Sequence, residues 1–234
     1  MSANRWFQGR LNQEDQLFRR AIPHSGELER HISDAVHRHA PRRRIEVVEL
    51  GCGTGFATAA ILRRRSSLSL TAVDHDPLSL VQARRNVRPW AKAVKFVRAD
   101  LLAFLARRPP ASVDAVASKF TLHNLEHPHR DKVLCQIHRV LKPGGVFVNA
   151  DKYALEGSAH EAELRKIMIT YVDLFLPLGR RGLLQEALDH TLHDEGETRV
   201  MRERQALRDM RRIGFRGIKR AFRRGMDAVF LATR

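Results

Sequence analysis

The chain has 234 residues, 43% of them hydrophobic, which is enough to bury the core of one large domain or of a domain with a modest insertion. No run of about 18 apolar residues occurs, so no membrane span is predicted, and the first ten residues lack the apolar core of a secretion signal. Only two cysteines are present, which argues against a disulfide framework. We therefore expect a cytoplasmic protein.

The net charge of +16 at pH 7 suggests nucleic acid as a partner. The arginines, however, form short clusters along the whole chain, as at 63–65 and 211–212, where helices are expected to end. Cations at such positions interact favourably with the helix dipole, so solvated helix ends explain the charge better than a phosphate-binding groove does. RNA binding is kept as the less favoured alternative.

From residue 45 onward, short apolar runs alternate with helical patterns, after a helical segment at 1–40 in which residues 28, 32, 35 and 36 share a face. Strands are predicted at 45–50, 68–73, 94–98, 113–118 and 146–150, the last after a turn at 142–145. Helices are predicted at 56–65, 77–88, 101–107 and 130–141. This rhythm is typical of a doubly wound parallel sheet with helices on both faces.

Residues 153–212 keep helical spacing without a convincing strand, and two further strands follow near 215–222 and 226–233. A tight connection through Arg224 and Gly225 would make these two strands antiparallel. The expected fold is therefore α/β, with a seven-stranded, mostly parallel sheet and an antiparallel last strand. We expect a single domain over 1–234, made of a helical segment (1–40), a core (41–152), a helical insertion (153–212) and the last two strands (213–234).

The first strand ends in the glycine loop, defined here as residues 51–55, Gly-Cys-Gly-Thr-Gly. A glycine-rich turn between a strand and a helix directs backbone N–H groups at a ligand and lets that ligand lie against the main chain. The dinucleotide fingerprint requires its third glycine at position 56, where Phe56 stands. The spacing therefore argues against a nicotinamide or flavin site.

The chain resembles the class I S-adenosylmethionine-dependent methyltransferases from about residue 45 to the C-terminus. Residues 49–55 resemble the first motif of that family, Asp74 the acid that accepts the ribose hydroxyls, Asp100 the acid that meets the adenine amino group, and 141–145 the turn before the fifth strand. The resemblance implies S-adenosylmethionine as cofactor, S-adenosylhomocysteine as product and a Rossmann-like sheet. The implied cofactor-binding residues are Glu49, Gly51, Cys52, Gly53, Gly55, Asp74, His75, Asp100, Leu101 and Ser118.

Structural alternatives exist for the acidic residues in this set. Asp74 and Asp100 each follow a strand and could instead cap the next helix. Glu49 could orient the glycine loop or approach the methionine amino group.

Beyond the fourth strand, His123 is the titratable side chain best placed to act as a general base, and its alternative role is packing or capping. The sequence there lacks the Asn/Asp-Pro-Pro-aromatic motif of base-amino methyltransferases, and Cys135 falls within a predicted helix, so nucleobase methylation is disfavoured. His127 and His129 suggest a metal site, but no second ligand pair has metal-site spacing, so no metal is predicted.

The resemblance is closest to the small-molecule and carboxy-S-adenosylmethionine-synthase-like branch, whose helices after the fifth strand cover the acceptor. His190 and Asp194 share one helical face there, either toward the acceptor or as a surface pair. The expected acceptor contacts are Phe7, Lys119, Lys152, Tyr171 and His190.

The sequence therefore predicts an enzyme, monomeric or homodimeric, that transfers a methyl group from S-adenosylmethionine to the N, O or S atom of a small molecule. The alternatives are an RNA methyltransferase and a non-catalytic subunit that binds S-adenosylmethionine.

Overall fold

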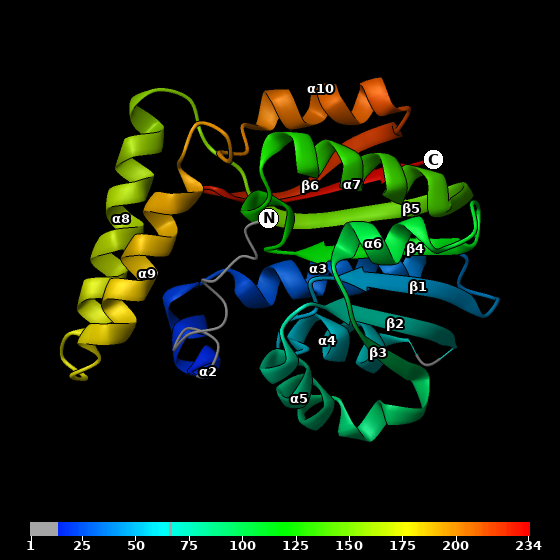
Figure 1. Cartoon of the computed structure of the whole chain (residues 1–234), viewed down its shortest axis with the longest axis horizontal. Helices are drawn as coiled ribbons and strands as arrows, with labels where there is room; N and C mark the ends of the chain where they lie inside the picture. The colour runs from blue at the N-terminus through cyan, green and yellow to red at the C-terminus, as the bar shows by residue number, and fades with distance from the viewer. Residues whose placement is uncertain (1–13, 66) are drawn as a thin grey trace.

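A single seven-stranded sheet forms the centre of the protein in the computed structural model, which describes residues 14–65 and 67–234 (Figure 1). The strand order is β3-β2-β1-β4-β5-β7-β6. Strands β1 to β5 are parallel, whereas β7 runs antiparallel to β5 and to β6. The strands are β1 (Ile45–Leu50), β2 (Leu68–Asp74), β3 (Val94–Arg98), β4 (Val113–Lys119), β5 (Leu141–Lys152), β6 (Arg216–Arg224) and β7 (Asp227–Thr233). The predicted fold class is confirmed.

Helices cover both faces of this sheet. One apolar cluster joins the sheet to α3, α4 and α5, and a second joins it to α6, α7 and α10. The longer helices are α3 (Ser25–Arg38), α4 (Phe56–Arg64), α5 (Pro77–Asn86), α6 (Leu101–Ala106), α7 (His127–Val140), α8 (Ser158–Phe175), α9 (Arg181–Asp194) and α10 (Glu203–Ile213). The short turns of helix are α2 (Asp15–Phe18), η2 (Arg19–Ala21), η3 (Arg88–Ala93) and η4 (Leu122–Asn124). None of the helices in the described ranges is long and apolar enough to cross a membrane.

The helix α3 packs on the sheet through the face that its sequence predicts. Leu28, Ile32 and Val36 are fully buried in the first apolar cluster. The guanidinium of Arg65, at the end of α4, donates to the carbonyls of Val36 and Ala40 at 3.2 and 2.8 Å. A cation at the carboxyl end of a helix satisfies carbonyls that lack a partner within the helix. This arginine is therefore a buried structural contact rather than a solvated charge.

Two elements begin three or more residues away from their predicted start. Helix α7 begins at His127 rather than at residue 130, because Pro128 occupies its first turn, where a missing N–H costs nothing. The predicted turn at 142–145 lies inside β5, as an irregularity between Leu141 and Val146. The strand therefore starts earlier than residue 146, and the glycines are accommodated as a break in its pairing.

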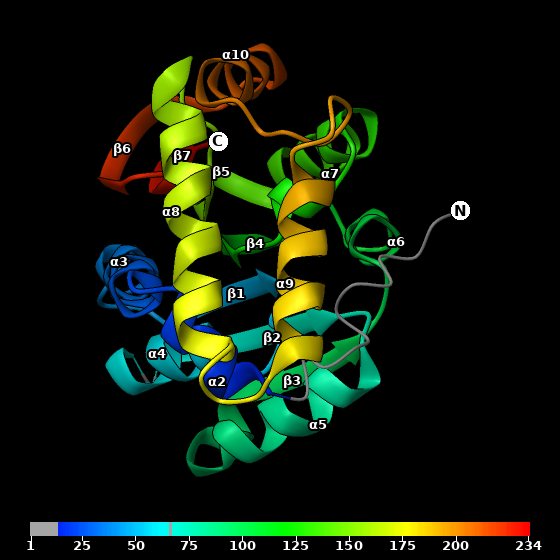
Figure 2. The same ribbon diagram turned by 90° about the vertical axis from the view of Figure 1, so that its left-hand side faces the viewer.

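The predicted helical insertion divides into two parts. Helices α8 and α9, residues 158–194, lie side by side in front of the sheet edge at which β4 ends, and we call them the lid (Figures 1 and 2). Phe18 of the N-terminal segment packs against Tyr171 and Phe175 of the lid. Helix α10, in contrast, packs on α7 and buries Met210 in the second apolar cluster. Only the first part of the insertion covers the sheet edge.

We expect Gly55→Ala to destabilise the protein by at least about 2 kcal/mol. Gly55 has φ +84°, and an added Cβ would lie 3.0 Å from the Cα of Ala83 in the neighbouring α5. The matched control is Gly26→Ala in α3, where an added Cβ meets nothing within 4 Å. That change should be neutral or stabilising by up to about 1 kcal/mol. Urea unfolding measures both, and equal losses would contradict this account of the α4–α5 contact.

Candidate functional site

A cavity of about 890 Å³ lies between the glycine loop and the lid. Its walls include Gly53 and Asp74 at the carboxyl ends of β1 and β2, and Tyr171 and His190 of the lid. The strand order reverses between β1 and β4, and ligands of open α/β sheets bind at such a point, beyond the carboxyl ends of the strands. The volume falls in the range of about 300–1,000 Å³ that is usual for ligand pockets. The topology and the cavity therefore identify the same edge of the sheet as the site.

The glycine loop has the backbone conformation that only glycine adopts without strain. Gly51 and Gly53 have φ values of +65° and +50°, and a Cβ at Gly51 would collide with the side chain of Thr121. At Gly53, which lines the cavity, an added Cβ meets no atom within 4 Å. The missing side chain at Gly53 therefore leaves room for a ligand directly against the main chain.

The carboxylate of Asp74 holds the glycine loop in place. Its Oδ2 accepts the backbone N–H of Gly53 at 2.8 Å, and its Oδ1 accepts that of Asp76 at 2.9 Å. A carboxylate has about four acceptor positions, so it can also accept hydroxyl groups from a ligand in the cavity. Asp76, rather than Asp74, caps α5 through the N–H of Ser79.

Glu49 is buried beneath the same loop. Its carboxyl accepts a hydrogen bond of 2.6 Å from the hydroxyl of Thr58 in α4, and burial raises the pKa of Glu49 to about 7. Glu49 therefore fixes the start of α4 and also borders the cavity. Asp100 likewise has both features, since it caps α6 through the N–H of Ala103 at 2.9 Å and lines the cavity.

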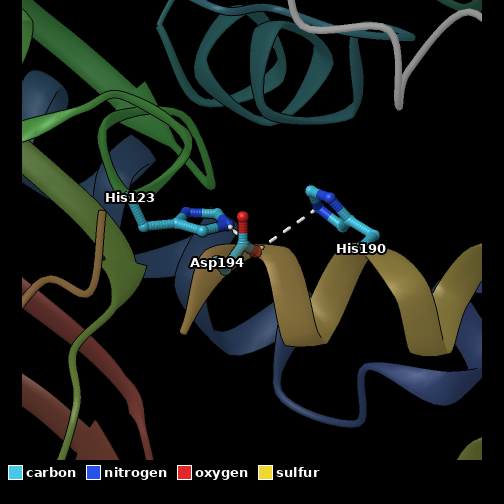
Figure 3. A group of neighbouring side chains, drawn as sticks. All are labelled: His123, His190 and Asp194. Carbon is cyan, nitrogen blue, oxygen red and sulfur yellow. Dashed lines mark ion pairs between the residues drawn. The ribbon is translucent and has the colours of Figure 1, made fainter. Parts of the chain in front are cut away.

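His123 lies at the lid side of the cavity between two buried carboxylates. Its Nδ1 is 2.5 Å from Oδ1 of Asp151, at the end of β5, and its Nε2 is 3.4 Å from Oδ2 of Asp194, in α9 (Figure 3). The second oxygen of Asp151 accepts the backbone N–H of Leu122 at 3.0 Å. These contacts join the turn η4, the strand β5 and the lid.

The two carboxylates determine the protonation state of this imidazole. Burial disfavours the imidazolium, but the charges of Asp151 and Asp194 outweigh burial and raise the pKa of His123 to about 9. Burial also opposes ionisation of Asp194, yet the charge of His123 lowers the pKa of Asp194 to about 2. At neutral pH His123 is therefore a cation, which is the wrong form for the general base suggested by the sequence.

Comparisons with known proteins point to methyltransferases. Residues 47–145 match a family model described as a methyltransferase domain. The carboxy-S-adenosyl-L-methionine synthase of Campylobacter curvus is 27% identical over 225 residues, which cover 93% of this chain and 89% of that protein. These similarities support a class I S-adenosylmethionine-dependent methyltransferase.

Two solved structures share the fold of this methyltransferase. A putative O-methyltransferase from Nostoc punctiforme superposes with a TM-score of 0.67 at 13% identity, covering 98% of this chain and 60% of that one. The structure of PigF with S-adenosylhomocysteine gives a TM-score of 0.58 at 16% identity, covering 81% and 50%. The methyltransferase thus spans 50% to 60% of the length of these two structures.

Most of the predicted cofactor-binding residues of the methyltransferase lie together along the cavity. The predicted residues that line it are Glu49, Gly51, Cys52, Gly53, Asp74, His75, Asp100 and Leu101. Ser118 and Gly55 are not among the lining residues. Ser118 is fully buried within β4, between β1 and β5, and Gly55 faces α5 instead.

The predicted acceptor contacts of the methyltransferase also reach the cavity, apart from Phe7, which lies outside the described residues. Lys119 pairs with Glu29 of α3 at 2.6 Å, and Lys152 pairs with Glu195, after α9, at 2.7 Å. Both lysines therefore join the sheet to the helices around the cavity.

The other two predicted contacts lie in the lid. Burial raises the pKa of Tyr171 to about 12 and lowers the pKa of His190 to about 4, so both side chains are neutral at pH 7.

We expect Asp74→Asn to lower the affinity of the methyltransferase for S-adenosylhomocysteine about ten- to a hundredfold, the loss typical of charge-assisted hydrogen bonds. Asp76→Asn is the matched control, because Asp76 does not line the cavity and asparagine caps helices as well as aspartate does. Isothermal titration calorimetry measures both. Equal affinities of the two variants for S-adenosylhomocysteine would show that Asp74 does not bind the cofactor.

We also expect His123 to stabilise the methyltransferase in a pH-dependent way. Because folding raises its pKa from 6.5 to about 9, its contribution is fully present below pH 6.5 and is lost as the pH rises through 9. The loss is at most about 3 kcal/mol. Chemical unfolding is measured across this pH range, in buffers with EDTA to remove metal ions. The free energy of unfolding should fall with pH in the unaltered protein and fall less steeply in His123→Gln. Parallel curves would contradict the raised pKa.

Proposed function

We propose that this methyltransferase transfers the methyl group of S-adenosylmethionine to a small molecule held between the glycine loop and the lid. The observation that supports the proposal is the cavity, whose lining continues from Gly53 and Asp74 to Tyr171 of α8 and Asp194 of α9. Methyl transfer from a sulfonium is an in-line displacement with a good leaving group. An enclosed site that aligns donor and acceptor and excludes water is what this reaction requires.

The donor would occupy the glycine-loop end of the cavity. The open space at Gly53 accommodates the methionine part against the main chain, Asp74 accepts the ribose hydroxyls, and Asp100 meets the adenine amino group. These roles follow from the family resemblance. They are supported by the acceptor positions that remain on Asp74 and by the position of all three residues on one wall.

The acceptor would occupy the lid end of the cavity. Asn124 lines this end, and its buried side-chain oxygen has no hydrogen-bond partner among the described residues. Tyr171 and Thr191 add hydroxyl groups on the lid side. Buried polar atoms are normally satisfied, so this end of the cavity suits a polar acceptor that donates a hydrogen bond to Asn124.

The charge of the cavity lining argues against RNA as the acceptor. Although the chain carries a net charge of +16, the lining is nearly balanced, with seven Asp or Glu side chains against six Lys or Arg side chains and the cationic His123. Two of the basic ones, Lys119 and Lys152, are already paired with glutamates. The exposed arginines of β6 lie on the edge strand of the sheet, where charged side chains prevent pairing with other chains. Among the described residues, the cavity lining therefore has no clear excess of basic side chains to attract a phosphate backbone.

A second candidate function is synthesis of carboxy-S-adenosyl-L-methionine. It is favoured by the similarity to proteins of that name over most of this chain. The reaction would use the same donor site, but a carboxyl group from a second substrate would replace one hydrogen of S-adenosylmethionine, and its methyl group would not be removed. The two activities therefore give products of different mass.

The test is incubation of the protein with S-adenosylmethionine and either a small-molecule filtrate or the RNA fraction of the same cells, followed by mass spectrometry. We expect S-adenosylhomocysteine to form with the filtrate and to be lost in Asp74→Asn, with Asp76→Asn as the active control. A product heavier than S-adenosylmethionine by the mass of CO2 would favour the synthase. Ribonuclease-sensitive turnover with RNA alone, or cofactor binding without turnover in any fraction, would overturn the proposal.

A further inference from the structure

Two histidines and an aspartate converge at the lid end of the cavity. His123 comes from the turn η4 after β4, whereas His190 and Asp194 lie one helical turn apart on α9 (Figure 3). One potential ligand atom from each residue lies within 4.8 Å of the other two, and all three side chains are buried. No other group of three such residues meets this condition in residues 14–65 and 67–234.

The spacing of these atoms matches that of ligands around a small cation. Oδ2 of Asp194 is 3.4 Å from Nε2 of His123 and 3.5 Å from Nε2 of His190. In a tetrahedral site with ligands about 2.0–2.1 Å from the metal, ligand atoms lie about 3.4 Å apart. Both distances are longer than a good hydrogen bond between these groups. The geometry therefore fits coordination to a shared ion better than it fits direct hydrogen bonds.

Asp151 sets the orientation of the first ligand. Its Oδ1 lies 2.5 Å from Nδ1 of His123 and holds the Nδ1 proton, while Nε2 is directed at Asp194. In the metal-free protein Nε2 also carries a proton, which metal binding would release. Asp151 is in turn fixed by the backbone N–H groups of Leu122 and Lys152 at 3.0 and 2.9 Å. A carboxylate that orients a histidine in this way is a regular feature of metal sites, because it fixes the tautomer and makes the free nitrogen a better ligand.

One oxygen of the cluster lacks a partner. Oδ1 of Asp194 is buried and makes no hydrogen bond to any described residue. Leaving a buried carboxylate oxygen unsatisfied is costly, and each such atom requires an explanation. A cation bound by both oxygens of the Asp194 carboxylate, beside the two imidazoles, would satisfy it.

We propose that Nε2 of His123, Nε2 of His190 and the carboxylate of Asp194 bind one divalent transition-metal ion, with Asp151 as the orienting carboxylate. Two imidazoles and one carboxylate form a donor set that suits Zn²⁺ and similar ions rather than Mg²⁺ or Ca²⁺. All three ligands line the cavity, so a three-ligand site keeps a coordination position open toward the acceptor. The ion joins the turn after β4 to α9.

The experiment is calorimetric titration of the metal-free protein with Zn²⁺, together with absorption spectroscopy of Co²⁺, whose visible bands report nitrogen and oxygen ligands. We expect one tight site per chain. His190→Gln and Asp194→Asn should each weaken it more than about a hundredfold, and Asp151→Asn about ten- to a hundredfold. The matched control is His193→Gln, a substitution of the same chemistry on α9 at a residue outside the cluster. It should bind the metal like the unaltered protein.

S-adenosylhomocysteine binding, measured in every variant, separates the possible failures. A variant that keeps its affinity for S-adenosylhomocysteine is folded. If the unaltered protein does not bind S-adenosylhomocysteine, the proposed function is wrong, but the metal site is unaffected. Absence of a saturable site for Zn²⁺, or equal Zn²⁺ affinity in His190→Gln, Asp194→Asn and His193→Gln, would overturn the metal site.

Discussion

The placement of His123 between two buried carboxylates is the contact on which the acceptor side of the site depends. Asp151 belongs to the sheet and Asp194 to the lid, so one imidazole joins the two parts of the protein. Removing one partner of a buried charge pair costs about 3–5 kcal/mol, because the remaining charge is left without compensation. The position of α9 relative to the sheet edge is therefore set by electrostatics in a low-dielectric environment, and the shape of the cavity follows from it.

Two further ionic contacts hold the walls of the same cavity. Lys152 of β5 and His160 of α8 both pair with Glu195, after α9, at 2.7 and 2.8 Å. On the opposite side Lys119 of β4 pairs with Glu29 of α3. Such pairs are worth little on an exposed surface, but these are mostly buried. The apolar clusters thus stabilise the sheet and its helices, while polar contacts position the helices that surround the cavity.

Much of the fold could be predicted because its signals are local. The alternation of apolar runs and helical patterns gave the strand sequence, and the spacing of Leu28, Ile32 and Val36 gave the buried face of α3. The predictions were wrong where packing between distant segments determines the position of an element. Met210 draws α10 onto α7 rather than into the lid, and β5 continues through the glycines at 144 and 145 because Leu141 pairs with Val113. Neither contact can be predicted from the spacing of apolar residues along the chain.

The same distinction explains which parts of the site could be predicted. The glycine loop and the acid after β2 lie at strand ends, so their convergence follows from the direction of parallel strands. The lid side of the site could not be predicted in this way, because it depends on a contact between segments that are distant in the sequence. Helical spacing placed His190 and Asp194 on one face, and the sequence predicted no metal because no second ligand pair was found. An i, i+4 pair on a helix already supplies two ligands in suitable geometry, so one residue from another element completes a site. The turn after β4 supplies that residue in His123, which the sequence had assigned to proton transfer.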